Sequence, residues 1–250
     1  MESGVGTGTF PNTHAYYYWD RTSLNIYTLG QWMLEFATQI PDTVEIQGID
    51  IASRLFPQTY PPNIELSIES ITSLPADWSG TFAYVHQRLL LAALTIDMWK
   101  SALAEIFRVL KPGGWVELVE TTSRIPLVGP CSIKLNSMKF ALYAHKNLLV
   151  DHKKQLRGLL LGAGFVGIEC IDHPVPIGES AGESGREART NFTNVVSAMK
   201  TPMLNAGGFG IVATEEEFDQ NVMKMREEWK RSEGVVEVFT FCAQKPFRQS

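Results

Sequence analysis

Amphipathic helical segments alternate with short apolar segments along most of this chain, and this alternation limits the possible folds. Apolar side chains recur at helical spacing over residues 29–40 and again over residues 99–110. Further helices are expected at 132–149 and 151–162, and Thr214 to Glu217 form a capping box that starts another. The strand-like segments between and after these helices are 44–50, 64–68, 82–85, 115–119, 165–171 and 235–243. Helices that alternate with such strands predict an α/β fold with a mostly parallel sheet.

Composition and charge exclude several classes of protein. The 250 residues are 44% hydrophobic and 20% charged, which is typical of a folded chain. A net charge of −5 argues against a nucleic-acid partner, and no apolar run approaches the roughly 20 residues of a membrane helix. The three cysteines, at 131, 170 and 242, show no metal-ligand spacing. We therefore expect no metal site, no signal peptide, no membrane span and a cytoplasmic location.

Candidate binding residues follow from where ligands bind in parallel sheets. Ligands bind beyond the carboxyl ends of the strands, so residues just after each strand are the ones to inspect. Asp50 ends the segment 44–50, and its carboxylate is suited to accept hydrogen bonds from two ribose hydroxyls. A turn or helix cap is the structural alternative for Asp50. Gly6 and Gly8 lie in a glycine-rich stretch that can approach a ligand closely, or that is simply a flexible terminus.

The segment FRVLKPGGWVELVE, residues 107–120, makes the pattern specific. It resembles the segment before the fifth strand of class I S-adenosylmethionine-dependent methyltransferases, and other pieces follow in that family's order. GVGTGT is similar to the glycine motif, VEIQGIDIA to the second strand with its ribose-binding acid, and FAYVHQR to the fourth strand. The resemblance covers residues 30–175 well and the last strand loosely. Within the family, the chain is most similar to the fungal methyltransferases that modify secondary metabolites.

The resemblance implies a fold and a set of roles. The fold is a Rossmann-like sheet, mostly parallel with an antiparallel C-terminal strand and with helices on both faces. The cofactor is S-adenosylmethionine, and the substrate is a small, largely apolar natural product. His86 and Arg88, just past the fourth strand, would face the substrate, with His86 as the first choice of base and His145 and His173 behind it. The cofactor-binding positions would be Gly6, Gly8, Gly30, Asp50, Ile51, Glu69 and Ser70.

The beginning of the chain departs from the family pattern. Only Met1 to Gly4 precede the glycine motif, where the family has a central strand, and residues 10–29 separate Gly8 from Gly30. One interpretation is a retained intron over 10–29. Another is that residues 24–29 supply the central strand, that Gly30 remains as the shortened glycine loop, and that residues 1–23 form an irregular arm. The acid expected at the start of the fourth strand is replaced by Ala83.

Three functions are consistent with these features. The first is methyl transfer to oxygen, nitrogen or carbon of a small substrate. The second is a chain that has lost methylation and uses the old cleft for a cyclisation or isomerisation without the cofactor. The third is a non-catalytic binding subunit, a homodimer formed through the aromatic arm that contains Tyr16 to Trp19. We expect a single domain over residues 1–250, in which 126–150 and 174–213 form substrate-side lid or insertion segments.

Overall fold

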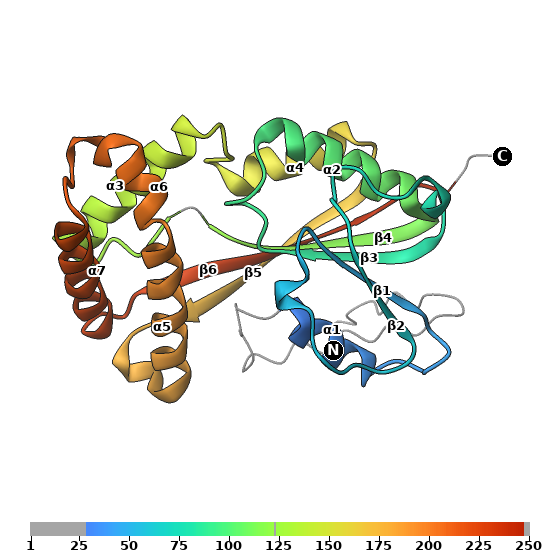
Figure 1. Cartoon of the computed structure of the whole chain (residues 1–250), viewed down its shortest axis with the longest axis horizontal. Helices are drawn as coiled ribbons and strands as arrows, with labels where there is room; N and C mark the ends of the chain where they lie inside the picture. Colours follow the sequence, from blue (N-terminus) through green and yellow to red (C-terminus); the bar gives the residue numbers. More distant parts are fainter. Residues whose placement is uncertain (1–28, 123, 248–250) are drawn as a thin grey trace, which may run out of the picture. The chain divides into compact units, whose positions relative to one another are not determined.

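The computed structural model describes residues 29–122 and 124–247, which divide after Ser70 into two compact units (Figure 1). The predictions for Gly6, Gly8, the arm over 1–23 and the strand over 24–29 lie outside the described residues, as does the split of the glycine motif. The single-domain expectation for residues 1–250 stays a prediction. Each unit is described by itself below.

The first unit is a helix packed on two parallel strands. Helix α1 (Leu29–Ala37) is followed by β1 (Ile46–Asp50) and β2 (Ile64–Ile68), and Ile46 pairs with Ile64 at the start of the parallel register. Met33 and Ala37 of α1 form a small core with Ile64. The predicted helix over 29–40 and the predicted strands over 44–50 and 64–68 are confirmed, but the helix ends three residues earlier and the first strand begins two residues later.

Gly48 on β1 allows α1 to approach the strands closely. A Cβ atom at this position would lie 2.6 Å from Leu66 Cδ2 and 2.8 Å from Met33 Sδ. Such distances are shorter than van der Waals contact, so the ends of the Leu66 and Met33 side chains must move to admit a side chain at this position.

The second unit contains a four-stranded sheet in the order β3-β4-β6-β5. Its strands are β3 (Phe82–Arg88), β4 (Leu110–Thr121), β5 (Val166–Pro176) and β6 (Val235–Gln244). β3 is parallel to β4, and β6 is antiparallel to both β4 and β5. The predicted antiparallel C-terminal strand is therefore confirmed, and it lies inside the sheet rather than at its edge.

Helices α2 (Ile96–Val109) and α4 (His152–Gly162) bury one face of this sheet (Figure 1). Trp99, Leu103 and Ile106 of α2 are fully buried, as their helical spacing predicts. They pack with Leu118 of β4 and Phe241 of β6 in the main core. This core fixes the carboxyl ends of β3 and β4, where functional residues are expected.

The KPGG segment, residues 111–114, belongs to a strand that is longer than the expected 115–119. Strand β4 begins at Leu110, directly after α2, and the pairing with β3 jumps from Phe82–Leu110 to Tyr84–Trp115. The segment therefore bulges out of the strand, and Gly113 adopts a φ of +80° that favours glycine. The backbone amide of Gly113 donates to the Lys245 carbonyl at 2.9 Å, which ties the bulge to the residue after β6.

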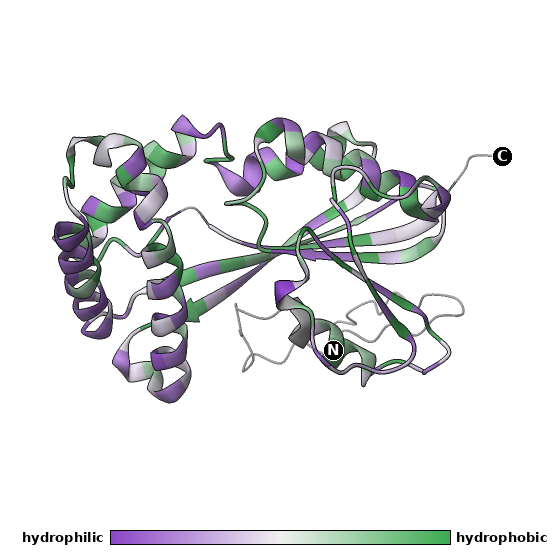
Figure 2. Ribbon diagram, viewed as in Figure 1, coloured by the Kyte–Doolittle hydropathy of each residue, from purple (hydrophilic) through white to green (hydrophobic). Residues whose placement is uncertain are grey.

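A group of helices stands beyond the carboxyl ends of β4 and β5 (Figure 1). It consists of α3 (Pro130–His145), α5 (Gly182–Ala198), α6 (Lys200–Asn205) and α7 (Glu215–Lys230). The segments 126–150 and 174–213 both contribute to it, and their substrate-side role stays a prediction. Figure 2 shows α7 as hydrophilic over much of its length, as expected for a helix with one face in solvent.

Two capping interactions fix the ends of these helices. Thr214 Oγ1 accepts the Glu217 amide at 3.1 Å, which confirms the predicted start of α7, while Glu217 Oε2 accepts the Ala213 amide at 2.9 Å. The start of α3 is held by Glu228 of α7, which accepts the amides of Cys131 and Ser132 at 2.8 Å each. A carboxylate at this position also interacts favourably with the helix dipole.

We expect Gly48→Ala to destabilise the first unit by about 1–3 kcal/mol, because the new methyl group collides with Leu66 and Met33. Hydrogen exchange of the amides in residues 29–70 measures this directly. Gly158→Ala is the matched control: a Cβ there meets nothing within 4 Å, and alanine favours the helix. Equal protection of residues 29–70 in Gly48→Ala and wild type would contradict the expectation.

Candidate functional site

The carboxyl edge of the first unit carries the predicted ribose-binding acid. Asp50 is the last residue of β1, and its Oδ1 accepts the Ala52 amide at 2.9 Å. The amide of Glu69 donates to the Asp50 carbonyl at 3.0 Å, so the predicted residues after both strands lie together. Ile51, which follows Asp50, has 79% of its surface exposed. A carboxylate beside an exposed apolar side chain fits a ribose diol beside an adenine ring.

The other predicted cofactor residues of this unit lie at two places. Gly30 is the second residue of α1, at the amino end of the helix, and Ser70 is half-buried directly after Glu69. Backbone amides at a helix start and polar groups past a strand are both suited to hold a polar ligand. The structure thus brings Asp50, Glu69 and Ser70 to one edge of the β1–β2 pair.

In the second unit, His86 and Arg88 belong to β3 itself. The expectation that they lie just past the strand is wrong, because pairing with β4 continues through Arg88 and Val119. His86 Nδ1 lies 2.9 Å from Oε1 of Glu117, its cross-strand neighbour. Burial lowers the pKa of His86, and the adjacent carboxylate of Glu117 partly opposes this shift. His86 is therefore a buried histidine held by a carboxylate, on the sheet face opposite the main core.

Gln87 and Glu120 project from the core face of the same two strands. Glu120 is fully buried and accepts hydrogen bonds from Gln87 Nε2 at 2.7 Å and from the Leu90 amide at 2.9 Å. Burial raises its pKa to about 8 despite these hydrogen bonds. The carboxyl group thereby fixes the backbone after β3, where Leu89 has a φ of +58°. Glu120 was not predicted as a functional residue.

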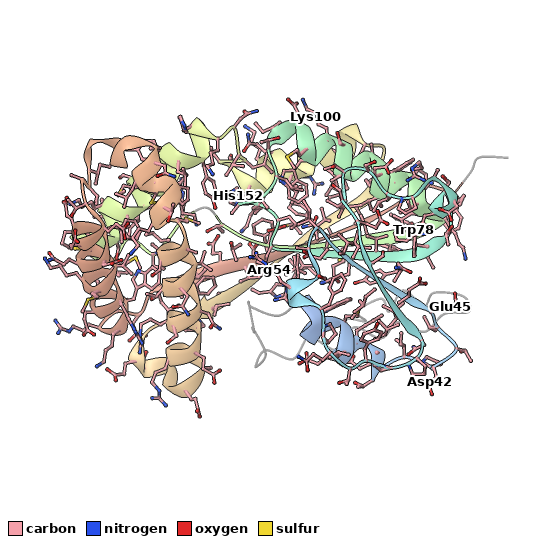
Figure 3. All side chains as sticks on the ribbon, in the orientation of Figure 1. Asp42, Glu45, Arg54, Trp78, Lys100 and His152 are labelled. Carbon is pink, nitrogen blue, oxygen red and sulfur yellow. The ribbon has the colours of Figure 1, made fainter. Side chains whose placement is uncertain are left out.

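A second buried polar cluster, formed by Lys139, Tyr143 and His152, lies at the end of β4. His152 begins α4, and its Nδ1 lies 2.8 Å from the carbonyl oxygen of Thr121, the last residue of β4 (Figure 3). Its ring stacks with that of Tyr143 of α3, with centroids 6.0 Å apart. Lys139, one turn before Tyr143, places Nζ 5.5 Å from the centre of the same ring. The cluster thus connects the strand end to the helical group.

Lys139 is the unusual member of this cluster because its side chain is 6% exposed. Among residues 29–122 and 124–247, no carboxylate pairs with its amino group. Burial without a counter-charge lowers the pKa of Lys139 to about 8. A substantial fraction of its amino groups is therefore neutral near pH 8. Such a perturbed group in a buried polar cluster marks a candidate catalytic position.

The remaining candidate bases lie apart from this cluster. His145 is exposed and packs its ring against Phe209, at 6.3 Å between centroids. His173 of β5 hydrogen-bonds the Thr240 hydroxyl at 3.1 Å. The signal that could have identified the cluster is the spacing of Ser132, Asn136, Lys139 and Tyr143. They form a polar stripe at i, i+4, i+7 and i+11 on the buried side of α3.

The comparisons with known proteins agree with the predicted family. A family model described as a methyltransferase domain matches residues 28–114. N-methyltransferase verN of Clonostachys rogersoniana is 29% identical over 212 residues, which cover 79% of this chain and 71% of that protein. N-methyltransferase gliN of Aspergillus fumigatus is 27% identical over 227 residues, covering 87% and 79%.

A solved structure shows the same fold. It is that of Haemonchus contortus phosphoethanolamine N-methyltransferase 2 in complex with S-adenosyl-L-methionine, with a TM-score of 0.51 and 11% identity. The match covers 88% of this chain and 47% of that one, so the chain spans about half of its length. The predicted Rossmann-like methyltransferase fold is confirmed by this likeness. In the part of the chain that the structure describes, none of the helices is both long and apolar enough to cross a membrane.

The pKa of Lys139 predicts a pH-dependent stability. Because the folded chain holds this proton less tightly than the unfolded chain, its unfolding free energy rises with pH between about 8 and 10.5. Below pH 8 the buried charge costs roughly 3 kcal/mol. Lys139→Met should therefore raise the unfolding free energy at pH 7 by about 1–3 kcal/mol and flatten its rise above pH 8, as measured by urea unfolding. Lys146→Met, at an exposed position at the end of α3, is the control. A Lys139→Met chain that is less stable than wild type at pH 7 would refute this.

Proposed function

The chain belongs to the class I S-adenosylmethionine-dependent methyltransferases of the fungal secondary-metabolite type, and we propose that it methylates a nitrogen atom of a small, largely apolar substrate. The choice of nitrogen rests on the relatives, which are named N-methyltransferases. The preference for a small substrate rests on the helical group past the strand ends, a position where α/β folds bind small molecules.

One observation carries the assignment to this chain: Asp50 ends β1 with its carboxylate beside the exposed Ile51. We propose that the carboxylate binds the ribose hydroxyls of the cofactor and that Ile51 covers the adenine ring. The link from the Glu69 amide to the Asp50 carbonyl holds the two strand ends together and thereby orients the carboxylate. Glu69 and Ser70 would then provide the polar groups near the adenine.

On the acceptor side we propose roles for residues of the second unit. The Glu117 carboxylate fixes the ring of His86 and thereby orients the end of β3, and Arg88 follows at the last position of that strand. Glu120 fixes the next residues through the amides of Leu90 and Leu91. Such groups align the acceptor, and alignment is the main requirement of methyl transfer. When bound, S-adenosylmethionine supplies an electrophilic methyl group with a good leaving group.

A methyl-transfer assay tests this function. The purified chain is incubated with S-adenosylmethionine carrying an isotopically labelled methyl group and a panel of small aromatic amines, secondary amides, phenols and carbon acids. We expect label in an amine or amide product. Label found only in phenols or carbon acids would show that the methyl acceptor is oxygen or carbon rather than nitrogen. An acceptor that is converted without cofactor would instead support a cyclase or isomerase, and no conversion of any kind would reject methyl transfer.

Asp50→Asn tests cofactor binding at one atom. The amide retains an oxygen for the Ala52 amide but removes the charge that strengthens hydrogen bonds from ribose hydroxyls. We expect the Kd for S-adenosylhomocysteine to rise about 10- to 100-fold in calorimetry, since a hydrogen bond to a charged group contributes about 1.5–3 kcal/mol. Asp42→Asn, in an exposed turn of the same unit, should leave the Kd unchanged. An equal Kd for Asp50→Asn and wild type would rule out this role.

A further inference from the structure

We propose that the amino group of Lys139 is the general base that takes the proton from the methyl acceptor. The inference rests on the proposed function, because it names a catalytic residue for the same transfer. It shifts the acid–base role from His86, the residue that the sequence favours, to a lysine on α3.

The surroundings of Lys139 provide the first argument. The side chain is more than nine-tenths buried, yet no carboxylate of the described residues pairs with it. Its neighbour is the face of the Tyr143 ring, 5.5 Å from Nζ. A purely structural lysine in the interior normally has an acidic partner or several hydrogen-bond acceptors. A lysine that serves as a base needs the opposite, a site that favours the neutral amine.

Its location provides the second argument. Thr121 at the end of β4 contacts His152, the His152 ring stacks with Tyr143, and Tyr143 lies under the Lys139 amine. The amine is therefore connected, through the rings of Tyr143 and His152, to the carboxyl end of a parallel strand, and ligands bind beyond such strand ends in this class of fold. His86, by contrast, lies within β3 with one ring nitrogen engaged by Glu117.

In the part of the chain that the structure describes, the charged groups around α3 have other partners than the Lys139 amine. From α4, His152 faces the cluster, with both ring nitrogens within 2.9 Å of backbone carbonyl oxygens. From β4, Glu120 acts on Tyr143. From α7, Glu217 binds Lys134, and Glu228 caps the start of α3. This arrangement agrees with the lowered pKa of Lys139, which is about 8. At pH 8 roughly half of the Lys139 amines are therefore neutral and can accept a proton.

The proposed step balances atoms and charge. A bond forms between the acceptor nitrogen and the methyl carbon, and the carbon–sulfur bond breaks with its electron pair moving to sulfur. The proton on the acceptor nitrogen moves to Nζ of Lys139, which becomes an ammonium group. The positive charge of the sulfonium is thus replaced by the charge on Lys139, and solvent removes the proton when the product leaves.

Competitive labelling with trace acetic anhydride tests the state and access of the amine without any turnover. The acetylation of each lysine is followed by mass spectrometry from pH 6.5 to 11. We expect Lys139 to be labelled with a midpoint near 8, and the exposed Lys146 serves as the reference lysine in the same sample. Absence of label on Lys139 at every pH, or a midpoint near 10, would overturn the proposal.

Variants then test the role in transfer, using whichever acceptor of the panel takes up label. Lys139→Arg retains a cation and Lys139→Met retains an unbranched apolar stem without the amine, but neither offers a base at pH 8. We expect both variants to lower kcat about 100-fold or more. In wild type we expect kcat to rise with pH through an inflection near pH 8, and this rise should be absent in both variants. Their Kd for S-adenosylhomocysteine should stay within about threefold of wild type, and their urea-unfolding curves show whether the second unit folds. Lys146→Met should behave as wild type.

The outcomes separate this inference from the proposed function. Transfer that keeps its rate and pH profile in Lys139→Arg, or an inflection that is lost in His86→Gln alone, overturns the role of Lys139 and leaves the methyltransferase assignment intact. Absence of transfer to every acceptor in wild type, with Lys139 still labelled near pH 8, rejects the proposed function and with it this role.

Discussion

The pairing of β6 between β4 and β5 is the interaction on which the second unit depends. The backbone groups of a buried strand must be paired on both sides, and here the last strand supplies partners for two strands that are far apart in sequence. Because β6 is antiparallel to both β4 and β5, these two strands run in the same direction. β4 and β5 both run toward the helical group, so the segments that follow them are delivered to one end of the sheet.

This placement explains why costly groups accumulate at that end. Glu120 and Lys139 are both buried, and burial shifts the pKa of each to about 8, from opposite directions. Burying ionisable groups lowers stability unless they are fully paired. In Glu120 the cost is offset by hydrogen bonds that hold the backbone after β3. For Lys139, no hydrogen bond that offsets the cost of burial is found among the described residues. The proposed role as a base accounts for a lysine at this position.

The fold was largely predictable, because periodicity reports which face of an element is buried. Trp99, Leu103 and Ile106 show the helical spacing of α2, and Thr214 with Glu217 shows the start of α7. Asp50 was found because the end of a strand is visible in sequence. Lys139 and His152 were not found, because a polar residue on a helix has the pattern of a solvent-facing one until tertiary packing buries it. The KPGG bulge was missed for a related reason: its partner, Lys245, lies on a distant segment.

The cap that Glu228 provides for α3 has a consequence for how relatives of this chain could diverge. The first turn of α3 is completed by a residue nearly one hundred positions later in the chain, on α7. The two helices are therefore coupled: residues 126–150 transplanted alone into another protein would lack the carboxylate that caps α3. Recombination of these segments is expected to exchange both helices together, or to preserve a carboxylate at the position of Glu228.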